Sequence, residues 1–435
     1  MSLIVKAGKM GKRVLKKFLP EEKHHVSYTR RIERVHTKER VVAMTFDDGP
    51  MDLPSSPDKF GGRALTDLLL DTLQEYHALG TFDVVGDTSE NYPDMAGKSG
   101  QADWGGVRYD HYPDINQDGR GGVVHNDRLV RRILHEGHQI TNHGYRHVLF
   151  GKKPFVYGKR DHFHGLDPVV ADLTRLHTLL QETYGYTMTM GRPPHYVDKI
   201  EGGFTSYDAY DQMGYLYLAA AFDGAGWLPI HHNTVQESLQ AEIAAMVEPM
   251  KRALEADPDA LAGQIIFQKD GYNMSRRTPV AFGLKQQLEL LQSYGYRVVT
   301  VEQLMADYSP FADVGREEPG FEKLVALQKT RGIVFSDNRL RLDDPMTWGE
   351  LAMLLAPRAE AIGRRVAKIR ETGTPQHANW GAMDWCAEQG ILKYAMDPDG
   401  TVSSLPSEFF GPAKDYTRRQ VYAAYRGQHP QWGRR

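Results

Sequence analysis

The sequence predicts an α/β protein whose parallel sheet is connected by crossover helices, followed by a smaller helical region. From about residue 38 to residue 308, short runs rich in β-branched and aromatic residues alternate seven times with amphipathic helical patterns. After Tyr308 only helical patterns continue. The length of 435 residues fits two or three domains.

The composition narrows the class of protein. A hydrophobic fraction of 41% and a charged fraction of 25% are typical of soluble globular proteins. The net charge of −3 provides no overall field that attracts nucleic acid or an anionic membrane, and no stretch reaches the roughly 18–20 apolar residues of a membrane span. Cys386 is the single cysteine, so a metal site has to be built from histidines and carboxylates.

Residues 1–37 are predicted to form a basic N-terminal arm. Lysines and arginines precede the first acid, Glu21, as in the charged part of a signal peptide. No apolar core or small-residue cleavage site follows, so no signal peptide is visible. A solvated arm is the preferred interpretation, and contact with a lipid surface is the alternative.

The β-α units can be placed in order along the chain. Strands are predicted at residues 41–44, 81–85, 138–141, 187–191, 215–222, 263–267 and 297–300. Between them, apolar residues at helical spacing mark crossover helices, for example Leu65, Leu68, Leu69 and Leu73. Such a sheet is either open or closed into a barrel, and in barrels the chemistry lies at the carboxyl ends of the strands.

The rest of the chain divides at a predicted linker. Residues 309–320 combine prolines, glycines and charges, which is typical of a linker. Residues 321–435 then form a helical domain with a weak internal repeat. In each half of the repeat a Gly-Ile turn and a polar loop precede a threonine, Thr347 or Thr417, that is suited to the N-cap of a helix.

Two motifs at predicted strand ends carry the chemistry. The segment Thr45-Phe46-Asp47-Asp48-Gly49-Pro50 places adjacent carboxylates directly behind a strand, and His143 and His147 follow a later strand at a spacing of four. One carboxylate and two imidazoles make a three-ligand set for a divalent metal, which leaves the second carboxylate free to move a proton. Each motif alone is more often an ordinary turn or an incidental histidine pair. Their order and shared position at strand ends favour a metal site.

These motifs resemble those of the polysaccharide deacetylase family, also called NodB-homology or carbohydrate esterase family four. Thr45–Pro50 matches the first family motif, and His143-Gly144-Tyr145-Arg146-His147 keeps both histidines of the second. Gly191-Arg192-Pro193-Pro194-His195 resembles the third, and Tyr296–Val301 resembles the closing strand. The resemblance covers residues 38–308 and implies a distorted (β/α)7 barrel.

The resemblance also implies roles for individual residues. Asp48, His143 and His147 would bind the metal, most often Zn²⁺, with Co²⁺, Ni²⁺ or Mn²⁺ as alternatives. Asp47 would be the general base, Arg192 would keep it ionised, and the backbone N–H of His195 would stabilise the oxyanion. The residues expected to contact substrate are His195, Tyr196, Asp223 and Trp227.

The chain departs from the family at two positions that normally work as a pair. Gly226 stands where the fourth motif has an aspartate, and Lys269 stands where the fifth has a histidine that acts as general acid. Lys269 is the candidate replacement, with His231 or His232 as alternatives. A third option is an ester substrate, because an alkoxide leaving group depends less on protonation than an amine does.

The C-terminal region resembles degenerate S-layer homology modules, which hold proteins to cell-wall polysaccharide. Thr417-Arg418-Arg419-Gln420 approximates their Thr-Arg-Ala-Glu motif, whereas Thr347-Trp348-Gly349-Glu350 lacks the arginine. The resemblance implies a second contact with cell-wall glycan. A helical appendage without a binding role is the alternative.

The sequence therefore predicts a metal-dependent hydrolase that removes acetyl groups from an N-acetylated polysaccharide such as peptidoglycan or a chitin-like glycan. The alternatives are an esterase acting on O-acetylated polysaccharide and a glycan-binding protein with weakened catalysis. Neither nucleic acid nor a membrane is an expected partner. The family resemblance suggests the cell envelope, while the lack of a visible signal peptide leaves a cytoplasmic location open.

Overall fold

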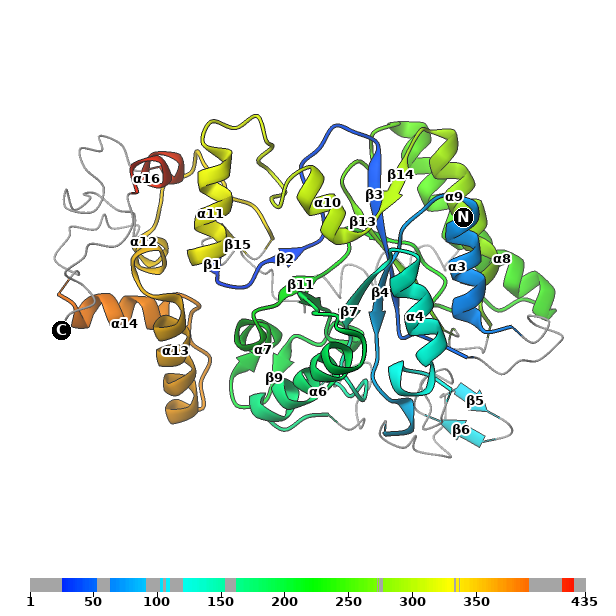
Figure 1. The fold of residues 1–435 in the computed structure, drawn as a ribbon, viewed down its shortest axis with the longest axis horizontal. Coiled ribbons are helices and arrows are strands. Elements are labelled where there is room, and N and C mark those ends of the chain that lie inside the picture. The colour runs from blue at the N-terminus through cyan, green and yellow to red at the C-terminus, as the bar shows by residue number, and fades with distance from the viewer. Residues whose placement is uncertain are drawn as a thin grey trace.

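The barrel is built from parallel strands that alternate with helices (Figure 1). The computed structural model describes residues 26–52, 63–90, 102–104, 107–109, 120–152, 162–271, 273, 277–331, 334–335, 337–390 and 417–425. Within these residues the main sheet has nine strands. They are β2 (Arg31–Ile32), β3 (Val41–Asp47), β4 (Thr81–Val84), β7 (Gln139–Asn142), β8 (Met190–Gly191), β11 (Leu216–Leu218), β12 (Phe222–Asp223), β13 (Ile265–Lys269) and β14 (Arg297–Val299).

Every pairing in this sheet is parallel, so all strands end at the same rim. The order is β12-β13-β3-β4-β7-β8-β11-β2, with β14 paired to the first half of β3. The chain passes from β11 to β12, near opposite ends of this order, through residues 219–221 alone. Such a short link shows that the sheet curls round on itself.

Backbone hydrogen bonds beyond β2 close the ring. The amide of Val35 donates to the carbonyl of Gly263 at 2.9 Å, and the amide of Ile265 donates to the carbonyl of Glu33 at 3.0 Å. These bonds join the continuation of β2 to the start of β13. The predicted distorted barrel is confirmed.

Helices cover the outside of the barrel (Figure 1). They are α3 (Leu65–Glu75), α4 (Asp127–His135), α6 (Leu166–Tyr184), α7 (Ser206–Met213), α8 (Val235–Ala256), α9 (Val280–Ser293) and α10 (Val301–Asp307). The predicted apolar faces point inward: Leu65, Leu69 and Leu73 of α3 are buried in the core beneath the sheet. Burial of such a stripe against the strands is what stabilises an amphipathic helix in a domain.

Shorter elements surround the barrel. They are the antiparallel pairs β1 (Val26–Ser27) with β15 (Val334–Phe335), β5 (Ala102–Trp104) with β6 (Val107–Tyr109) and β9 (Lys199–Ile200) with β10 (Phe204–Thr205), and the 3₁₀ turns η1 (Thr88–Glu90), η3 (Val123–His125) and η4 (Pro194–Tyr196). In the part of the chain that the structure describes, no helix is both long and apolar enough to cross a lipid bilayer.

Three predictions about element boundaries differ from the structure. The run 215–222 is two strands, because the chain leaves one side of the barrel and enters the other within it. The predicted arm 1–37 contains the edge strand β2, where Ile32 is fully buried; residues 1–25 lie outside the described residues. The predicted linker 309–320 packs into a core through Phe311. Two-residue strands and single buried aromatics leave no periodic signal in a sequence.

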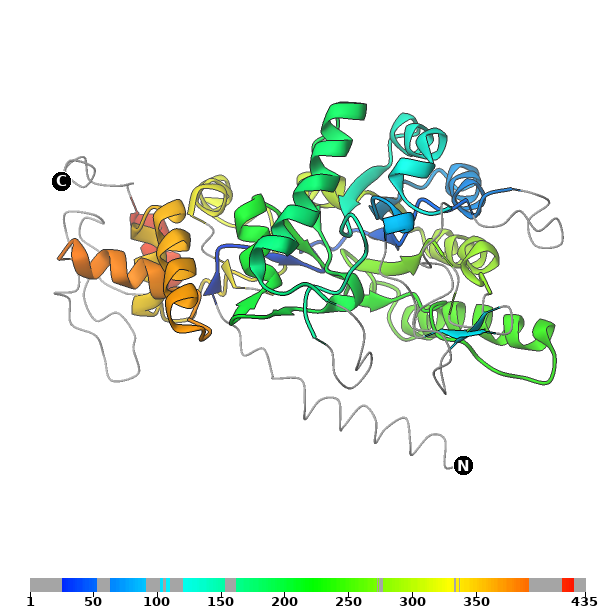
Figure 2. The same cartoon turned by 90° about the horizontal axis from the view of Figure 1, so that it is seen from below.

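A second group of helices lies beside the barrel, at one end of the molecule in both views (Figures 1 and 2). They are α11 (Phe321–Arg331), α12 (Trp348–Leu355), α13 (Arg358–Thr372), α14 (Trp380–Glu388) and α16 (Arg418–Ala424). These helices share a separate hydrophobic core, which includes Trp348, Leu351 and Trp385. Much of the second half of the predicted repeat, residues 391–416, lies outside the described residues.

Charged contacts join the two parts. Arg365 of α13 pairs with Asp208 of α7, and Asp208 also accepts the amide of Thr205 at 2.8 Å in the capping box of that helix. Arg30, next to β2, donates to the side chain of Asn338 at 3.0 Å. The C-terminal helices therefore pack against the barrel through specific polar partners.

The two threonines of the predicted repeat both cap helices. Thr347 begins α12 and Thr417 begins α16, each in a capping box. The arginine of the Thr-Arg motif, Arg418, is 5% exposed and donates to Glu350 at 2.5 Å. This guanidinium connects the two halves of the repeat internally. Glycan binding by this region stays a prediction.

We predict that Arg418→Ala destabilises the C-terminal helices by about 3 kcal/mol, because it leaves the carboxylate of Glu350 buried without its cation. Arg419→Ala is the matched control, since the side chain of Arg419 is 40% exposed and its loss removes only surface ion pairs. Urea unfolding followed by tryptophan fluorescence measures both. Equal stability of the two variants would show that Arg418 has no structural role.

Candidate metal centre

The predicted site residues converge on the carboxyl rim of the barrel. Asp47 is the last residue of β3 and Lys269 the last residue of β13, and these two residues are register partners. His143 follows β7 directly, and Arg192 follows β8. Since parallel strands deliver their carboxyl ends to one edge, residues far apart in sequence meet there.

One oxygen of Asp48 faces both imidazoles. Its Oδ1 lies 3.2 Å from Nε2 of His143 and 3.1 Å from Nε2 of His147. Ligand atoms around a tetrahedral zinc ion are about 3.3 Å apart. All three residues are buried, and one ligand atom from each lies within 4.8 Å of the others. A nitrogen-nitrogen-oxygen set at this spacing fits a divalent cation of the zinc type.

The backbone of the site is held in unusual conformations. Asp48, His147, His195 and Tyr196 have positive φ angles of 81°, 53°, 55° and 53°. Residues other than glycine rarely adopt this region, and each such residue costs about 1–3 kcal/mol. Gly144, between the two histidines, also has a positive φ, of 88°. The surrounding fold therefore sets the directions of these side chains.

Asp47 is paired with an arginine and is not one of the three candidate metal ligands. Its Oδ1 pairs with Arg192, a fully buried side chain that also donates to the hydroxyl of Thr45 at 3.1 Å and to the carbonyl of Leu218 at 3.2 Å. The Oδ2 of Asp47 lies 3.9 Å from Nε2 of His143. One carboxylate oxygen is thus anchored, and the other faces the candidate ligands.

The two neighbouring aspartates have opposite pKa shifts. Burial raises the pKa of Asp47 to about 6, although Arg192 opposes this shift. Burial also acts to raise the pKa of Asp48, but Lys269 and the two imidazoles outweigh it and hold that pKa well below its ordinary value. Asp48 is therefore a permanent anion, and Asp47 is close to the range in which a group exchanges protons at neutral pH.

The two histidines also differ. Burial lowers the pKa of His147 to about 4, so its imidazole is neutral. Burial acts in the same direction on His143, but Asp83, Asp48 and Asp47 outweigh it and raise its pKa well above the ordinary value. A cation bound by these residues would take the place of one proton on His143.

Lys269 supplies the nearest positive charge to Asp48. Its ammonium pairs with Oδ2 of Asp48, the oxygen that does not face the imidazoles, and the side chain is 6% exposed. Gly226, at the other departure from the family, has a φ of 84°, and a side chain there is strained whatever the space. Lys269 thus lies at the rim of the site, and Gly226 has no side chain that could pair with it.

Asp83 is a site residue that the sequence analysis missed. It lies in β4, is fully buried, and accepts a hydrogen bond from the hydroxyl of Thr141 at 2.6 Å. Its Oδ2 lies 2.9 Å from Nδ1 of His143, which also lies 2.9 Å from the carbonyl oxygen of Arg192. When a cation replaces one of the two protons of His143, we assign the remaining proton to Nδ1 on this basis, which would leave the lone pair of Nε2 for the cation.

The predicted substrate-contacting residues fall into two groups. His195 packs edge-on beside the ligands, with its ring 5.0 Å from that of His147, and the ring of Tyr196 lies 5.3 Å from the guanidinium of Arg192. Asp223 is at the end of β12, where it accepts the indole N–H of Trp227 at 3.2 Å. His195 and Tyr196 line the candidate metal centre, whereas Asp223 and the half-buried Trp227 form a pair at the end of another strand.

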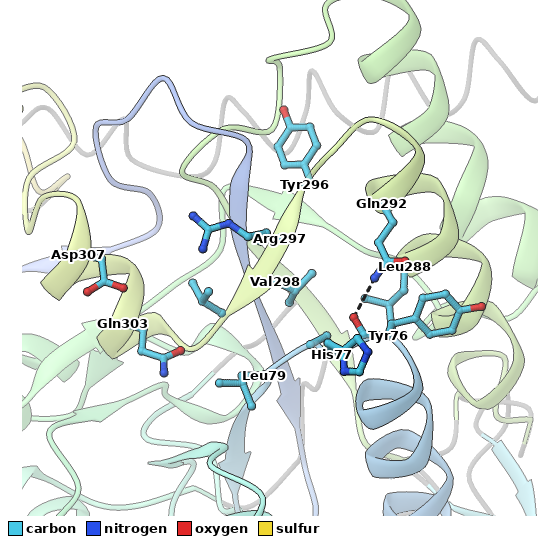
Figure 3. A pocket seen from close by; sticks show the side chains of 12 residues that line it. Tyr76, His77, Leu79, Leu288, Gln292, Tyr296, Arg297, Val298, Gln303 and Asp307 are labelled. Atoms are coloured by element: carbon cyan, nitrogen blue, oxygen red, sulfur yellow. Dashed lines mark hydrogen bonds between the residues drawn. The ribbon is translucent and has the colours of Figure 1, made fainter.

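A cavity of about 420 Å³ lies at the opposite end of the barrel (Figure 3). Its walls come from Tyr76 to Leu79, which precede β4, and from β14 and the helices next to it. Gln292 donates to the carbonyl of Tyr76 at 2.8 Å across this space. The predicted site residues are absent from its lining.

The fold and the site define an α/β barrel with a candidate Asp-His-His metal centre at its carboxyl rim. Residues 34–197 match the family model described as polysaccharide deacetylase. The matched segment contains Asp47, Asp48, both histidines and Arg192. It ends before Gly226 and Lys269, where the chain departs from the family pattern.

Curated relatives match a longer region. The chain is 22% identical over 282 residues to the peptidoglycan-N-acetylmuramic acid deacetylase PdaC of Bacillus subtilis, which is 65% of this chain and 42% of that protein. It is 21% identical over 303 residues to the peptidoglycan-N-acetylglucosamine deacetylase PgdA of Listeria monocytogenes, which is 70% of this chain and 46% of that protein. The chain thus spans less than half the length of these relatives.

A solved structure is also similar. The chitin deacetylase of Colletotrichum lindemuthianum is 19% identical, with a TM-score of 0.41, over 64% of this chain and 92% of that chain.

We predict that Asp83→Asn lowers metal affinity about 10- to 100-fold, because the carboxylate that orients His143 is lost while its shape is kept. Competition against a chromogenic chelator measures the affinity. Asp87→Asn is the control: it changes another buried aspartate paired with a histidine, His125 at 2.7 Å, outside the candidate ligand set. The same affinity in both variants would contradict the role of Asp83.

Proposed function

We propose that the protein is a metal-dependent hydrolase that removes acetyl groups from an N-acetylated polysaccharide, with Zn²⁺ or another divalent ion bound by Asp48, His143 and His147. The observation that carries this proposal is the arrangement of the two aspartates: Asp48 faces both imidazoles, and Asp47 stands beside them with one oxygen held by Arg192. That division provides separate groups for binding a cation and for moving a proton.

The family and the relatives support the substrate class. Residues 34–197 match the polysaccharide deacetylase family model, and the two curated relatives are named as peptidoglycan deacetylases. We therefore propose an N-acetylated cell-wall glycan as the substrate and the cell envelope as the place of action.

The protein's own residues divide the chemical work. A divalent cation, when bound, supplies Lewis acidity and lowers the pKa of a water molecule to about 7. Asp47 takes the proton of the attacking water, and Arg192 fixes the direction of its carboxylate. His195 and Tyr196 border the position of the acetyl group, and the backbone N–H of His195 stabilises the negative charge on the carbonyl oxygen.

Lys269 is the proposed proton donor to the leaving amine. In the structure its ammonium pairs with Asp48, so it must exchange that partner to reach a leaving group. An ester substrate needs this proton less than an amide does, which keeps O-deacetylation as the second candidate function. Release of acetate from matched N- and O-acetylated glycan oligomers, with and without zinc after chelation, distinguishes the two. No release from either class, in protein shown to hold zinc, would exclude both.

We predict different consequences for the two adjacent aspartates. Asp48→Ala should abolish metal retention, because it removes the ligand that both imidazoles face. Asp47→Asn should retain the metal and lower the rate of acetate release about 10²- to 10⁴-fold, as expected for loss of a general base. Metal content measured by mass spectrometry and acetate release are compared in the same preparations. Equal metal loss in both variants would overturn the assignment.

We predict that Lys269→Met slows acetate release from an N-acetylated oligomer by at least 10-fold more than from an O-acetylated one. Methionine keeps much of the length of the side chain but has no proton to donate. Lys199→Met is the control, since Lys199 is an exposed lysine of β9. An equal effect of Lys269→Met on both substrates would show that Lys269 is not the acid.

A further inference from the structure

A second histidine cluster lies apart from the candidate metal centre. His162, Phe163 and His164 follow one another where His162 forms a parallel β-bridge with Leu149, and successive side chains of strand-like backbone point to opposite faces. Phe163 is buried in the core, and its amide donates to the carbonyl of Leu149 at 3.0 Å. His162 and His164 consequently share the other face, with their ring centroids 4.8 Å apart.

Glu201 meets both imidazoles from another part of the chain. It follows β9, and its two oxygens divide between the rings: Oε1 lies 2.7 Å from Nε2 of His162, and Oε2 lies 3.0 Å from Nδ1 of His164. His162 forms a β-bridge with Leu149, and the backbone two residues further on closely approaches the residues before Glu201, since a side chain at Gly151 would collide with the carbonyl of Lys199. The position of Glu201 opposite the histidines is therefore fixed by the fold.

We propose that His162, His164 and Glu201 form a second site for a divalent transition-metal ion, separate from the Asp48 centre. Two imidazoles and one carboxylate are a ligand set that Zn²⁺ uses in proteins, with water in the fourth position. One ligand atom from each residue lies within 4.8 Å of the others. The side chain of His164 is 71% exposed and that of Glu201 is 45% exposed, so an ion reaches them from solvent.

The position of this second site suggests what the ion does. His162 pairs with Leu149, two residues beyond His147, and Glu201 lies six residues beyond His195. An ion bound by His162, His164 and Glu201 would therefore connect two segments. One is paired with the chain just after His147, and the other is the hairpin that follows His195. The site is structural: it ties together two segments at the edge of the barrel rim.

Zinc stoichiometry tests this proposal without any measurement of activity. The full chain is prepared without a histidine tag, stripped with chelator and titrated with ZnCl₂ in a calorimeter. We expect two ions per wild-type chain, one in Asp48→Ala, and none in Asp48→Ala combined with His164→Ala. Glu201→Gln in the Asp48→Ala background should weaken the remaining site at least 10-fold.

A matched control separates a built site from ordinary surface binding. His36 forms an exposed pair with Glu317 at 3.7 Å, and His36→Ala should leave the second ion in place. Absence of any ion in the Asp48→Ala chain would overturn the proposal, as would an unchanged affinity after His164→Ala. Because the measurement is made in a chain without the Asp48 ligand, its result does not depend on the proposed hydrolase activity.

Discussion

The shared contact of Asp48 with two imidazole nitrogens, at 3.2 Å and 3.1 Å, is the interaction on which the rest of the site depends. It exists because two parallel strands on either side of β4 deliver their ends to one rim: Asp48 follows β3, and the turn from His143 to His147 follows β7. Positive φ angles at Asp48 and His147 turn both side chains toward the same point. The barrel thereby brings together ligands that lie about a hundred residues apart.

Charge balance explains the residues around this contact. Asp47, Asp48 and Asp83 place three carboxylates in a buried space, which is costly unless each has a partner. Arg192 pairs with Asp47, and Lys269 pairs with Asp48, while His143 lies between Asp48 and Asp83. A bound cation adds positive charge to a region that already uses two fixed cations to balance its acids.

The sequence predicted the barrel and the residues that meet at its rim, because motifs at strand ends keep a recognisable order and spacing. It did not predict a role for Asp83, which lies inside an apolar strand. That role follows from the pairing of β4 with β7, in which Asp83 is the register partner of Thr141. The sequence also could not predict that Lys269 pairs with Asp48, because this contact depends on the register between β13 and β3. The same holds for Glu201, which meets the His162–His164 pair through tertiary contact alone.

Anomalous diffraction at the zinc edge, from crystals grown with zinc, tests the central claim most directly. The account predicts a peak bound by Oδ1 of Asp48 and by Nε2 of both His143 and His147, at about 2.0–2.2 Å, with Asp47 still held by Arg192 and outside the coordination sphere. A peak coordinated by Asp47 in place of Asp48, or no peak between the two imidazoles, would contradict it.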